Sequence, residues 1–469
     1  MLKRRVYGIT ATFLLLGMLA LAFSIRPVDA EPATIVVPDD YPTIQEAVNN
    51  ADNGDAVFVR NGTYDENIVV NKSLSLVGED RDTTIIDGGR RDGYVVHVKA
   101  ENVVIQGFTI KESSIFSIGI RLDNARNSSI VDNNIMHNGF GILVWGSPYT
   151  NVSANNLYGN VNCGIGVLGS HNVHVSSNNV HYTVQFGISV SYCNPSYVYD
   201  NRITQCRWGL HIGGSGVYIF SNSFVGNWDN AIYLRDARRN TIRQNNITGC
   251  GEWGAIFQFA NSSDNLIFQN NFINNTDKVR DFAWEFEEYV LSTNTWDSNF
   301  EGNYWSNYTG VDLDHDGIGD SWHEIDQNNT DHCPLMGMFH GFNTSIDYHV
   351  NVISNSTIED FEYFESNSTI KMYVSNITAN QVFGFCRICI PHALINETYH
   401  VTVNGTEPYH VNYSLYDDGE NRWIYFAYEH STLEIIVVPE FPFFLVLPLL
   451  MIITLLAVIV YRRKPKIKQ

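Results

Sequence analysis

The phrase Asp132-Asn133-Asn134-Ile135 decides the fold, because it returns as Ala154-Asn155-Asn156-Leu157 and then five more times. The later copies begin at Ser177, Asp200, Ser221, Gln244 and Gln269. The first asparagines of successive copies are 22, 23, 23, 21, 23 and 25 residues apart. A second phrase keeps the same step, from Gly119-Ile120 through Gly141-Ile142 to Ala255-Ile256. Two phrases with one period indicate a repeated structural unit.

Each unit contains short alternating apolar runs separated by Asn, Gly and Ser, which is typical of strands. Leucine-rich repeats have a similar period, but the sequence lacks their leucine-and-helix signature. We therefore predict an all-β chain whose main part is a right-handed parallel β-helix with coils of about 22 residues. Coils stacked about 4.8 Å apart place the repeated asparagines above one another. Each amide should then donate a hydrogen bond to the next, as a ladder that satisfies polar groups at an inward corner.

The first coils are less regular than the repeats. Residues 41–48 form the pattern of a short amphipathic helix that would cover the open end of the solenoid. This helix, Val77-Gly78-Glu79, residues 105–110 and the asparagine repeats together resemble the pectate-lyase-like β-helix superfamily. More narrowly, they resemble the periplasmic copper-binding NosD-type proteins and their surface relatives, over about residues 34 to 336. The resemblance implies the fold and leaves the activity open, because this fold hosts lyases, hydrolases, binding proteins and structural proteins.

The two ends of the chain predict export and an anchor. Residues 1–30 have the basic, apolar and small-residue layout of a signal peptide. We assign residues 31–338 to the β-helix, with a helical N-terminal cap and an acidic C-terminal loop. Residues 339–438 are expected to form an immunoglobulin-like β-sandwich that acts as a spacer. Residues 439–461 are expected to form a transmembrane or sorting segment, followed by a basic cytoplasmic tail over 462–469.

Pro439-Glu440-Phe441 resembles the Pro-Glu-Phe sorting signals of archaeal surface proteins, which implies cleavage and exchange for a lipid anchor. A retained single-pass helix with its C-terminus inside is the other interpretation. Both place the protein on the extracellular face of the cell membrane. Sixteen Asn-x-Ser/Thr sequons suit an extracellular glycoprotein. The net charge of −21 excludes general nucleic-acid binding.

An acidic loop near the end of the solenoid has the pattern of a calcium site. Its carboxylates alternate around a glycine turn, so they can converge on one cation, and Ca²⁺ prefers six to eight oxygen ligands. The predicted ligands are Asp312, Asp314, Asp316, Ile318 and Asp320. His323 occupies the place where an EF-hand requires Glu, so the loop is closer to thrombospondin-type calcium repeats. We predict a structural calcium ion here, and a solvated acidic turn is the alternative.

Alternation within the coils separates the core from the surface. The columns of Ile142 and Val144 point inward, so the column between them points outward. Aromatic and polar side chains mix along this outward column and its neighbour, which suits the stacking of sugar rings. The predicted glycan-binding residues are Trp145, His211, Tyr233, Arg235 and Phe257.

We predict no catalytic residues on this face. A glycosidase needs two carboxylates about 5–10 Å apart. Asp123 lies alone at one end of the outward columns, and Asp229 and Asp236 lie near the other end.

Copper is implied only by the resemblance to NosD-type proteins. The nearest cluster of suitable ligands is His332, Cys333 and His340, and the sequence contains no His-x-His or Met-rich array.

The sequence therefore predicts an exported, membrane-anchored cell-surface protein whose calcium-capped β-helix binds extracellular or cell-wall glycans. Three alternatives stay open. They are a polysaccharide lyase or glycoside hydrolase, a structural surface-layer component, and a NosD-like copper-handling accessory protein.

Overall fold

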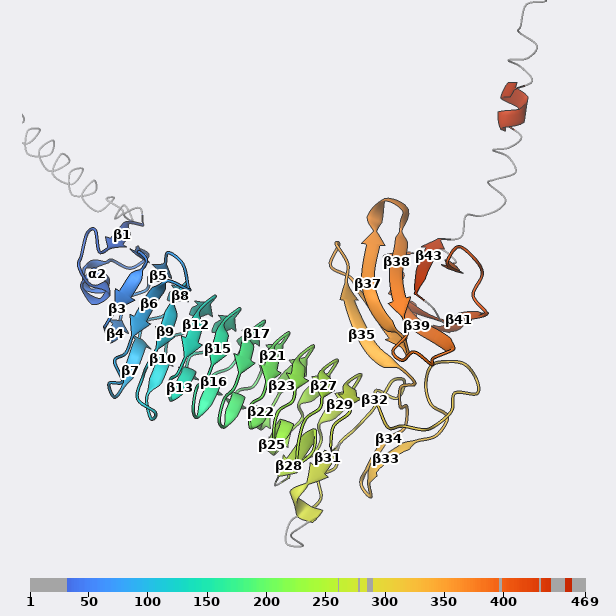
Figure 1. Ribbon diagram of the computed structural model, residues 1–469, viewed down its shortest axis with the longest axis horizontal. Helices are drawn as coiled ribbons and strands as arrows, with labels where there is room; N and C mark the ends of the chain where they lie inside the picture. The colour runs from blue at the N-terminus through green and yellow to red at the C-terminus, as the bar shows by residue number, and fades with distance from the viewer. Residues whose placement is uncertain are drawn as a thin grey trace, which may run out of the picture.

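The computed structural model describes residues 32–259, 261–276, 279–284, 290–395, 399–429, 432–439 and 452–457. These residues form a long parallel solenoid followed by a sandwich of antiparallel sheets (Figure 1). The predicted signal peptide and basic tail, and most of the predicted membrane or sorting segment, lie outside the described residues. Within the described ranges, no helix is long and apolar enough to cross a membrane.

Three parallel sheets run along the solenoid, and successive coils add one strand to each sheet. Sheet A contains β1 (Thr34–Val37), β2 (Ala56–Val59), β5 (Ser75–Gly78), β8 (Val104–Gln106), β11 (Ser129–Val131), β14 (Asn151–Ser153), β17 (Val173–Ser176), β20 (Ser196–Tyr199), β23 (Val217–Phe220), β26 (Thr241–Arg243) and β29 (Leu266–Phe268). Sheet B contains β3 (Gly62–Tyr64), β6 (Thr84–Asp87), β9 (Thr109–Lys111), β12 (Asn134–Met136), β15 (Asn156–Tyr158), β18 (Asn179–His181), β21 (Arg202–Thr204), β24 (Ser223–Val225), β27 (Asn246–Thr248), β30 (Asn271–Ile273) and β32 (Tyr304–Trp305). Sheet C contains β4 (Ile68–Val70), β7 (Tyr94–Val98), β10 (Ile118–Asp123), β13 (Phe140–Trp145), β16 (Cys163–Leu168), β19 (Phe186–Ser191), β22 (Trp208–Ser215), β25 (Asn230–Arg238), β28 (Ile256–Phe259) and β31 (Val279–Asp281). The predicted parallel β-helix is confirmed.

Apolar side chains in register fill the solenoid. Ile142 pairs with Ile165, which pairs with Ile188, and all three side chains are fully buried. The column two residues further on, which includes Val144 and Val190, is buried in the same way. Each such side chain contributes about 1.5–3 kcal/mol relative to exposure. The inward columns were therefore predicted correctly.

The asparagine ladder is also confirmed. Asn155 Nδ2 donates to Asn178 Oδ1 at 3.1 Å, and the same oxygen accepts the backbone N–H of Asn155 at 3.0 Å. The residue before each ladder asparagine has a positive φ, near 55–59°, which turns the corner between sheets A and B. The ladder continues beyond the sequence repeat to Asn303, and there it ends on the buried carboxylate of Asp331.

The helix α2 (Ile44–Asn50) lies beside the first coils at the N-terminal end. It begins three residues later than predicted, because Thr43 is extended and its Oγ1 accepts the N–H of Glu46 at 3.1 Å as an N-cap. The buried face of α2 packs Ile44 and Val48 into the core of the solenoid.

Two antiparallel sheets form the C-terminal part, as predicted. The five-stranded sheet has the order β35 (Met338–Asn343), β36 (His349–Ser354), β39 (Phe383–Pro391), β42 (Asn421–Glu429) and β41 (His410–Asp417). The four-stranded sheet has the order β37 (Thr357–Phe364), β38 (Thr369–Ser375), β43 (Leu433–Pro439) and β40 (Tyr399–Val403). The sequence pattern missed β35 and β37, and three of the eight residues of β37 are acidic and exposed. The immunoglobulin-like topology stays a prediction.

The sandwich packs on the C-terminal end of the solenoid, beside the hairpin of β33 (His323–Asp326) and β34 (Asn329–Asp331). Arg387 of β39 is 1% exposed and lies across this junction. Its Nε donates to Glu301 at 3.2 Å, one terminal N–H donates to the backbone oxygen of Asp316 at 2.7 Å, and its guanidinium covers the ring of Phe300. Asn271 adds a pair of hydrogen bonds to the backbone of Phe339. A buried charge with these partners fixes the two parts against each other.

Candidate functional site

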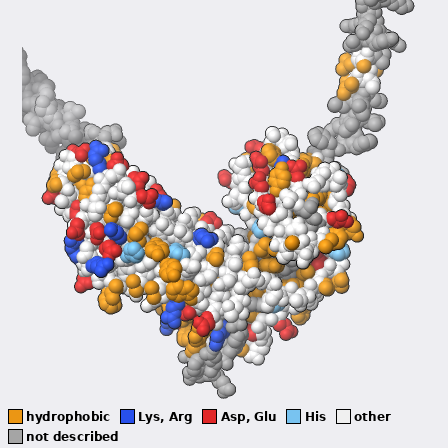
Figure 2. Space-filling model, in the orientation of Figure 1, with side chains coloured by type: hydrophobic (Ala, Val, Ile, Leu, Met, Phe, Trp, Pro, Cys, Tyr) orange, Lys and Arg blue, Asp and Glu red, His pale blue; other side chains and the backbone are white. Residues whose placement is uncertain are grey.

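The outward face of sheet C carries the predicted glycan-binding columns. Parallel register places Ser189 beside His211, His211 beside Tyr233 and Tyr233 beside Phe257. Arg235 lies in the neighbouring outward column, two residues after Tyr233. Figure 2 shows hydrophobic side chains gathered on the solenoid with histidines among them.

A hollow of about 540 Å³ opens in this face. It exists because Gly166 and Ser189 are small and lie between Leu143 and His211 in the register, and Ser191 is small beside Leu168. Its lining consists of Phe140, Leu143, Asn162, Cys163, Gly166, Val167, Leu168, Gln185, Phe186, Ser189, Ser191, His211, Tyr233 and Arg235. The volume lies within the range of about 300–1,000 Å³ that small-molecule sites occupy.

Three aromatic rings stack beside the hollow. The rings of Phe186 and Trp208 are 4.7 Å apart, and that of Tyr233 lies 6.1 Å from Trp208 and 6.5 Å from Phe186. The planes of Phe186 and Tyr233 differ by only 2°. The coils hold these rings in register, so they present a common apolar edge to a ligand.

Polar groups lie next to these rings. Ser189 Oγ and His211 Nδ1 are 2.9 Å apart. Burial, with a smaller effect from Arg235, lowers the pKa of His211 to about 4, so its imidazole is neutral at neutral pH. Burial also raises the pKa of Tyr233, which keeps its phenol protonated. The floor therefore offers neutral hydrogen-bonding groups, with the guanidinium of Arg235 as the charged member.

Two predicted residues lie outside the hollow. Trp145 is 47% exposed, and the guanidinium of Arg121 lies 4.9 Å from its ring. Phe257 is only 8% exposed, and the rings of Tyr233, Trp253 and Phe282 lie against it. The hollow brings together the other three predicted residues, His211, Tyr233 and Arg235.

Sequence reasoning missed Phe186 and Trp208. They lie just before the Gly-Ile phrase, in a column where Phe140 and Cys163 hold the equivalent places. Aligning the repeats by their period would have shown this third outward column, because its members keep the same step as the glycines.

A charged cluster on the same face was also missed. His97 Nε2 lies 2.7 Å from Asp123 Oδ2, and Arg121 lies 2.7 Å from Asp123 Oδ1. The hydrogen bond from Arg121, with help from His97, lowers the pKa of Asp123. A carboxylate held ionised in this way is a poor proton donor, so Asp123 does not suit the acid role of a glycosidase. His97 escaped notice because it lies in an irregular coil before the repeats begin.

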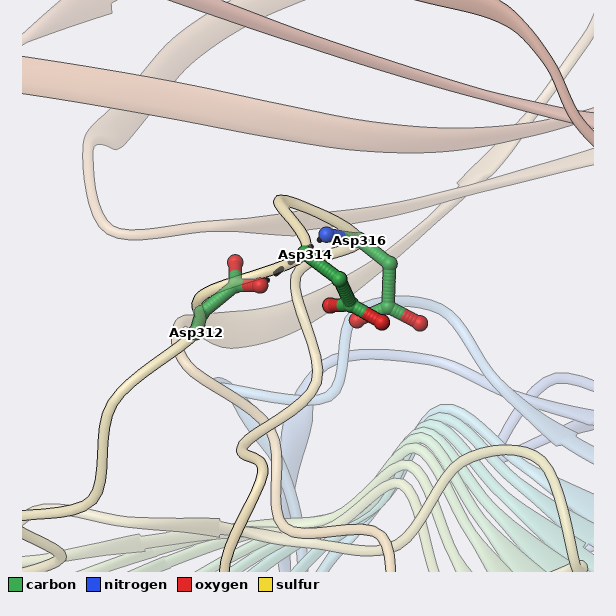
Figure 3. Close-up of side chains that lie close together, drawn as sticks. All are labelled: Asp312, Asp314 and Asp316. Carbon is green, nitrogen blue, oxygen red and sulfur yellow. Dashed lines mark hydrogen bonds between the residues drawn. The ribbon is translucent and has the colours of Figure 1, made fainter.

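The acidic loop brings three of its predicted ligands together. Asp312, Asp314 and Asp316 each place a carboxylate oxygen within 4.8 Å of the others (Figure 3). The carboxylate of Asp312 also accepts the N–H groups of Asp316 and Gly317 at 3.0 and 2.9 Å. Burial raises the pKa values of Asp312 and Asp316, which indicates carboxylates that a cation would stabilise. This all-oxygen donor set fits the chemistry of Ca²⁺.

The remaining predicted ligands lie in the same loop. The N–H of Ile318 donates to Asp316 Oδ1 at 2.7 Å, and Asp320 Oδ2 accepts the N–H of Leu313 at 2.6 Å. Arg387 lies 3.4 Å from the other carboxylate oxygen of Asp316 and already offsets part of the loop's charge.

The residues considered for copper do not form a comparable cluster. Among the described residues, only the three aspartates Asp312, Asp314 and Asp316 form a group of three or more His, Cys, Asp or Glu side chains with ligand atoms within 4.8 Å of one another. His332 instead pairs with Asp297 at 2.9 Å, and burial raises the pKa of Cys333 to about 11. Burial lowers the pKa of His340 to about 4, and its ring stacks near Phe342.

Comparison with known proteins agrees with this architecture. Residues 140–295 match the family model described as the right handed beta helix region. These residues run from β13 through β31 and include every residue that lines the hollow. The predicted right-handed β-helix is thus confirmed for the central coils. The archaeal sorting signal finds no support among these comparisons.

Curated relatives match short segments. A probable ABC transporter binding protein NosD of Pseudomonas aeruginosa is 30% identical over 138 residues, which are 29% of this chain and 28% of that protein. A cell surface glycoprotein of Methanothermus fervidus is 30% identical over 128 residues, 27% of this chain and 21% of that protein. The chain spans less than a third of the length of these relatives. Among solved structures, the Dettilon tailspike protein is 14% identical with a TM-score of 0.41, covering 86% of this chain and 93% of its own. The resemblance to NosD-type β-helix proteins is confirmed.

Proposed function

We propose that this protein is an exported cell-surface protein that binds glycans through the hollow on sheet C. The observation that carries the proposal is the hollow itself. Small residues at Gly166, Ser189 and Ser191 open a space of about 540 Å³ beside a stack of aromatic rings. Sugar rings bind where an aromatic surface meets neutral hydrogen-bonding groups.

A surface location is part of the same proposal. It is supported by the similarity of one segment to a protein named as a cell surface glycoprotein. The sixteen sequons and the net charge of −21 suit a solvated extracellular surface. Calcium in the loop of Asp312, Asp314 and Asp316 would serve a structural role, because the loop packs at the junction and not beside the hollow.

The proposal is tested by screening the purified protein on a glycan array and measuring the affinity of each bound glycan by calorimetry. Tyr233→Ala should weaken binding about tenfold, which corresponds to about 1.4 kcal/mol. Ser189→Phe should abolish it, because the new ring fills the hollow without entering the core. Tyr218→Ala is the matched control, since Tyr218 belongs to an aromatic stack on sheet A.

Equal binding by all three variants, or no glycan bound by the parent protein, would refute the proposal. An assay for newly formed reducing or unsaturated sugar ends separates binding from cleavage. Release of such ends by the parent protein, lost in Tyr233→Ala, would assign a lyase or hydrolase activity to this face.

A further inference from the structure

A second hollow, of about 630 Å³, lies where the sandwich meets the acidic loop. Its floor consists of Phe385 of β39 and Tyr425 of β42, whose rings stack 5.6 Å apart and are buried. Tyr409 is 75% exposed at the rim, with the ring of Phe383 5.7 Å away. The lining residues are His315, Asn355, Phe383, Gly384, Phe385, Tyr409, His410, Tyr425 and Ala427.

Two imidazoles form one wall of this second hollow. The rings of His315 and His410 are 5.4 Å apart, and they lie 6.3 and 6.1 Å from the ring of Tyr425. Within the described part of the chain, neither imidazole forms a hydrogen bond to the protein. Their polar atoms therefore stay available to a ligand beside an aromatic floor.

The position of His315 depends on the acidic loop. Its φ is +57°, a left-handed conformation, in the turn that the carboxylate of Asp312 closes by accepting two backbone N–H groups. The loop also packs on the floor, because a Cβ at Gly317 would lie 3.4 Å from the ring of Phe385. The solenoid end and the sandwich thus build this hollow together.

We propose that the second hollow binds a neutral saccharide unit. None of its nine lining residues has a fixed charge, so the lining provides no ionic partner for an acidic ligand. The rings of Tyr409 and Phe383 suit the C–H face of a sugar, and the imidazoles suit its hydroxyl groups. A purely apolar ligand would instead leave the imidazole nitrogens without partners.

An added peptide strand fits this hollow less well. β41 is the edge strand of the five-stranded sheet, but its register with β42 shifts between Asn412 and Tyr416. Such an irregularity blunts an edge against strand addition. The saccharide site stands on its own geometry and does not depend on the hollow of sheet C.

The test uses the full-length protein and three neutral probes, maltohexaose, cellohexaose and mannohexaose, with affinities measured by calorimetry. At least one probe should bind, and Tyr409→Ala should weaken it about tenfold. Ala427→Leu, which adds bulk to the lining without changing charge, should weaken it as much. Tyr348→Ala is the control, because Tyr348 is an exposed aromatic residue of the sandwich outside the lining.

Tyr233→Ala separates this site from the hollow of sheet C. If Tyr233→Ala removes all probe binding and Tyr409→Ala changes nothing, the second site is refuted and the proposed function survives. If only Tyr409→Ala and Ala427→Leu weaken binding, the second site is supported and the sheet C proposal fails for these probes. No binding of any probe, or equal effects of Tyr409→Ala and Tyr348→Ala, would also overturn the second site.

Discussion

Replacing Asn178 by alanine should destabilise the solenoid strongly, whereas the same change at Asn179 should have little effect. Asn178 is a buried rung of the ladder, and its Oδ1 accepts both the backbone N–H and the amide Nδ2 of Asn155, at 3.0 and 3.1 Å. Its own Nδ2 donates to the backbone oxygen of Val152 at 2.9 Å and to Asn201 Oδ1 at 3.0 Å.

The magnitude follows from these contacts. Asn178→Ala leaves the buried N–H of Asn155 without its acceptor, which costs about 1–3 kcal/mol. The two bonds donated by the amide nitrogen add about 0.5–1.5 kcal/mol each. We therefore expect a total loss of about 2–6 kcal/mol. Asn179 is exposed and donates one side-chain bond, to Asn156 at 2.9 Å, so its replacement should change stability by less than about 0.5 kcal/mol.

The assay is urea unfolding of both variants and the parent protein, followed by far-ultraviolet circular dichroism in one buffer. A lower midpoint with an unchanged slope reports lost stability and not a changed unfolded state. The two variants share residue type, strand neighbourhood and repeat, so they differ only in which side of the coil the amide faces. An Asn179→Ala loss as large as that of Asn178→Ala would refute the assignment of the ladder.

Three further predictions concern the C-terminal end of the solenoid. Burial raises the pKa of Asp331 from 3.8 to about 6, so the stability that its protonated form provides is complete below pH 4 and is lost as the pH rises to about 6. Asp331→Asn should remove this pH dependence of the melting temperature, although it loses one of the two oxygens that accept N–H groups from Asn303, Trp305 and Cys333. A chelator should lower the melting temperature of the parent protein but not that of Asp314→Asn, and an identical chelator response in both would contradict the calcium loop. Arg387→Ala should lower the free energy of unfolding by about 3–5 kcal/mol, because it leaves the buried carboxylate of Glu301 without its cation. Adding Glu301→Gln should recover much of this stability. Additive losses in the double variant would contradict the pairing.

The sequence predicted the solenoid well because each coil contacts mainly the coils before and after it. A ladder amide such as Asn178 needs an equivalent residue about 22 positions away, and this requirement appears directly as a repeat. The terminal rung was not predicted, because Asp331 follows Asn303 by 28 residues and replaces the amide with a carboxylate. The last rung of the ladder therefore comes from a segment that folds back onto the solenoid outside the repeat, so the repeat period does not predict it.

The candidate sites were less predictable, because part of their surroundings comes from segments outside the repeat. His211 and Tyr233 could be placed on the outward face because alternation within the repeat fixes which face each residue takes, and both line the hollow. Phe257 was predicted to bind glycans from the outward face, but it is only 8% exposed, with the rings of Trp253 and Phe282 against it. Contacts such as that of Arg387 with Glu301, 86 residues apart, have no local signature at all.

The buried ladder stabilises the fold, whereas the outward columns carry the residues of the proposed glycan site. Inward positions are tied to neighbours on both sides, so a change there costs stability, whereas an outward side chain such as that of Ser189 can change size at little cost to the fold. Substitutions at single outward positions can therefore change the shape of the hollow of sheet C without unfolding the solenoid. The second hollow differs, because it exists only while the junction around Arg387 holds the acidic loop against the sandwich.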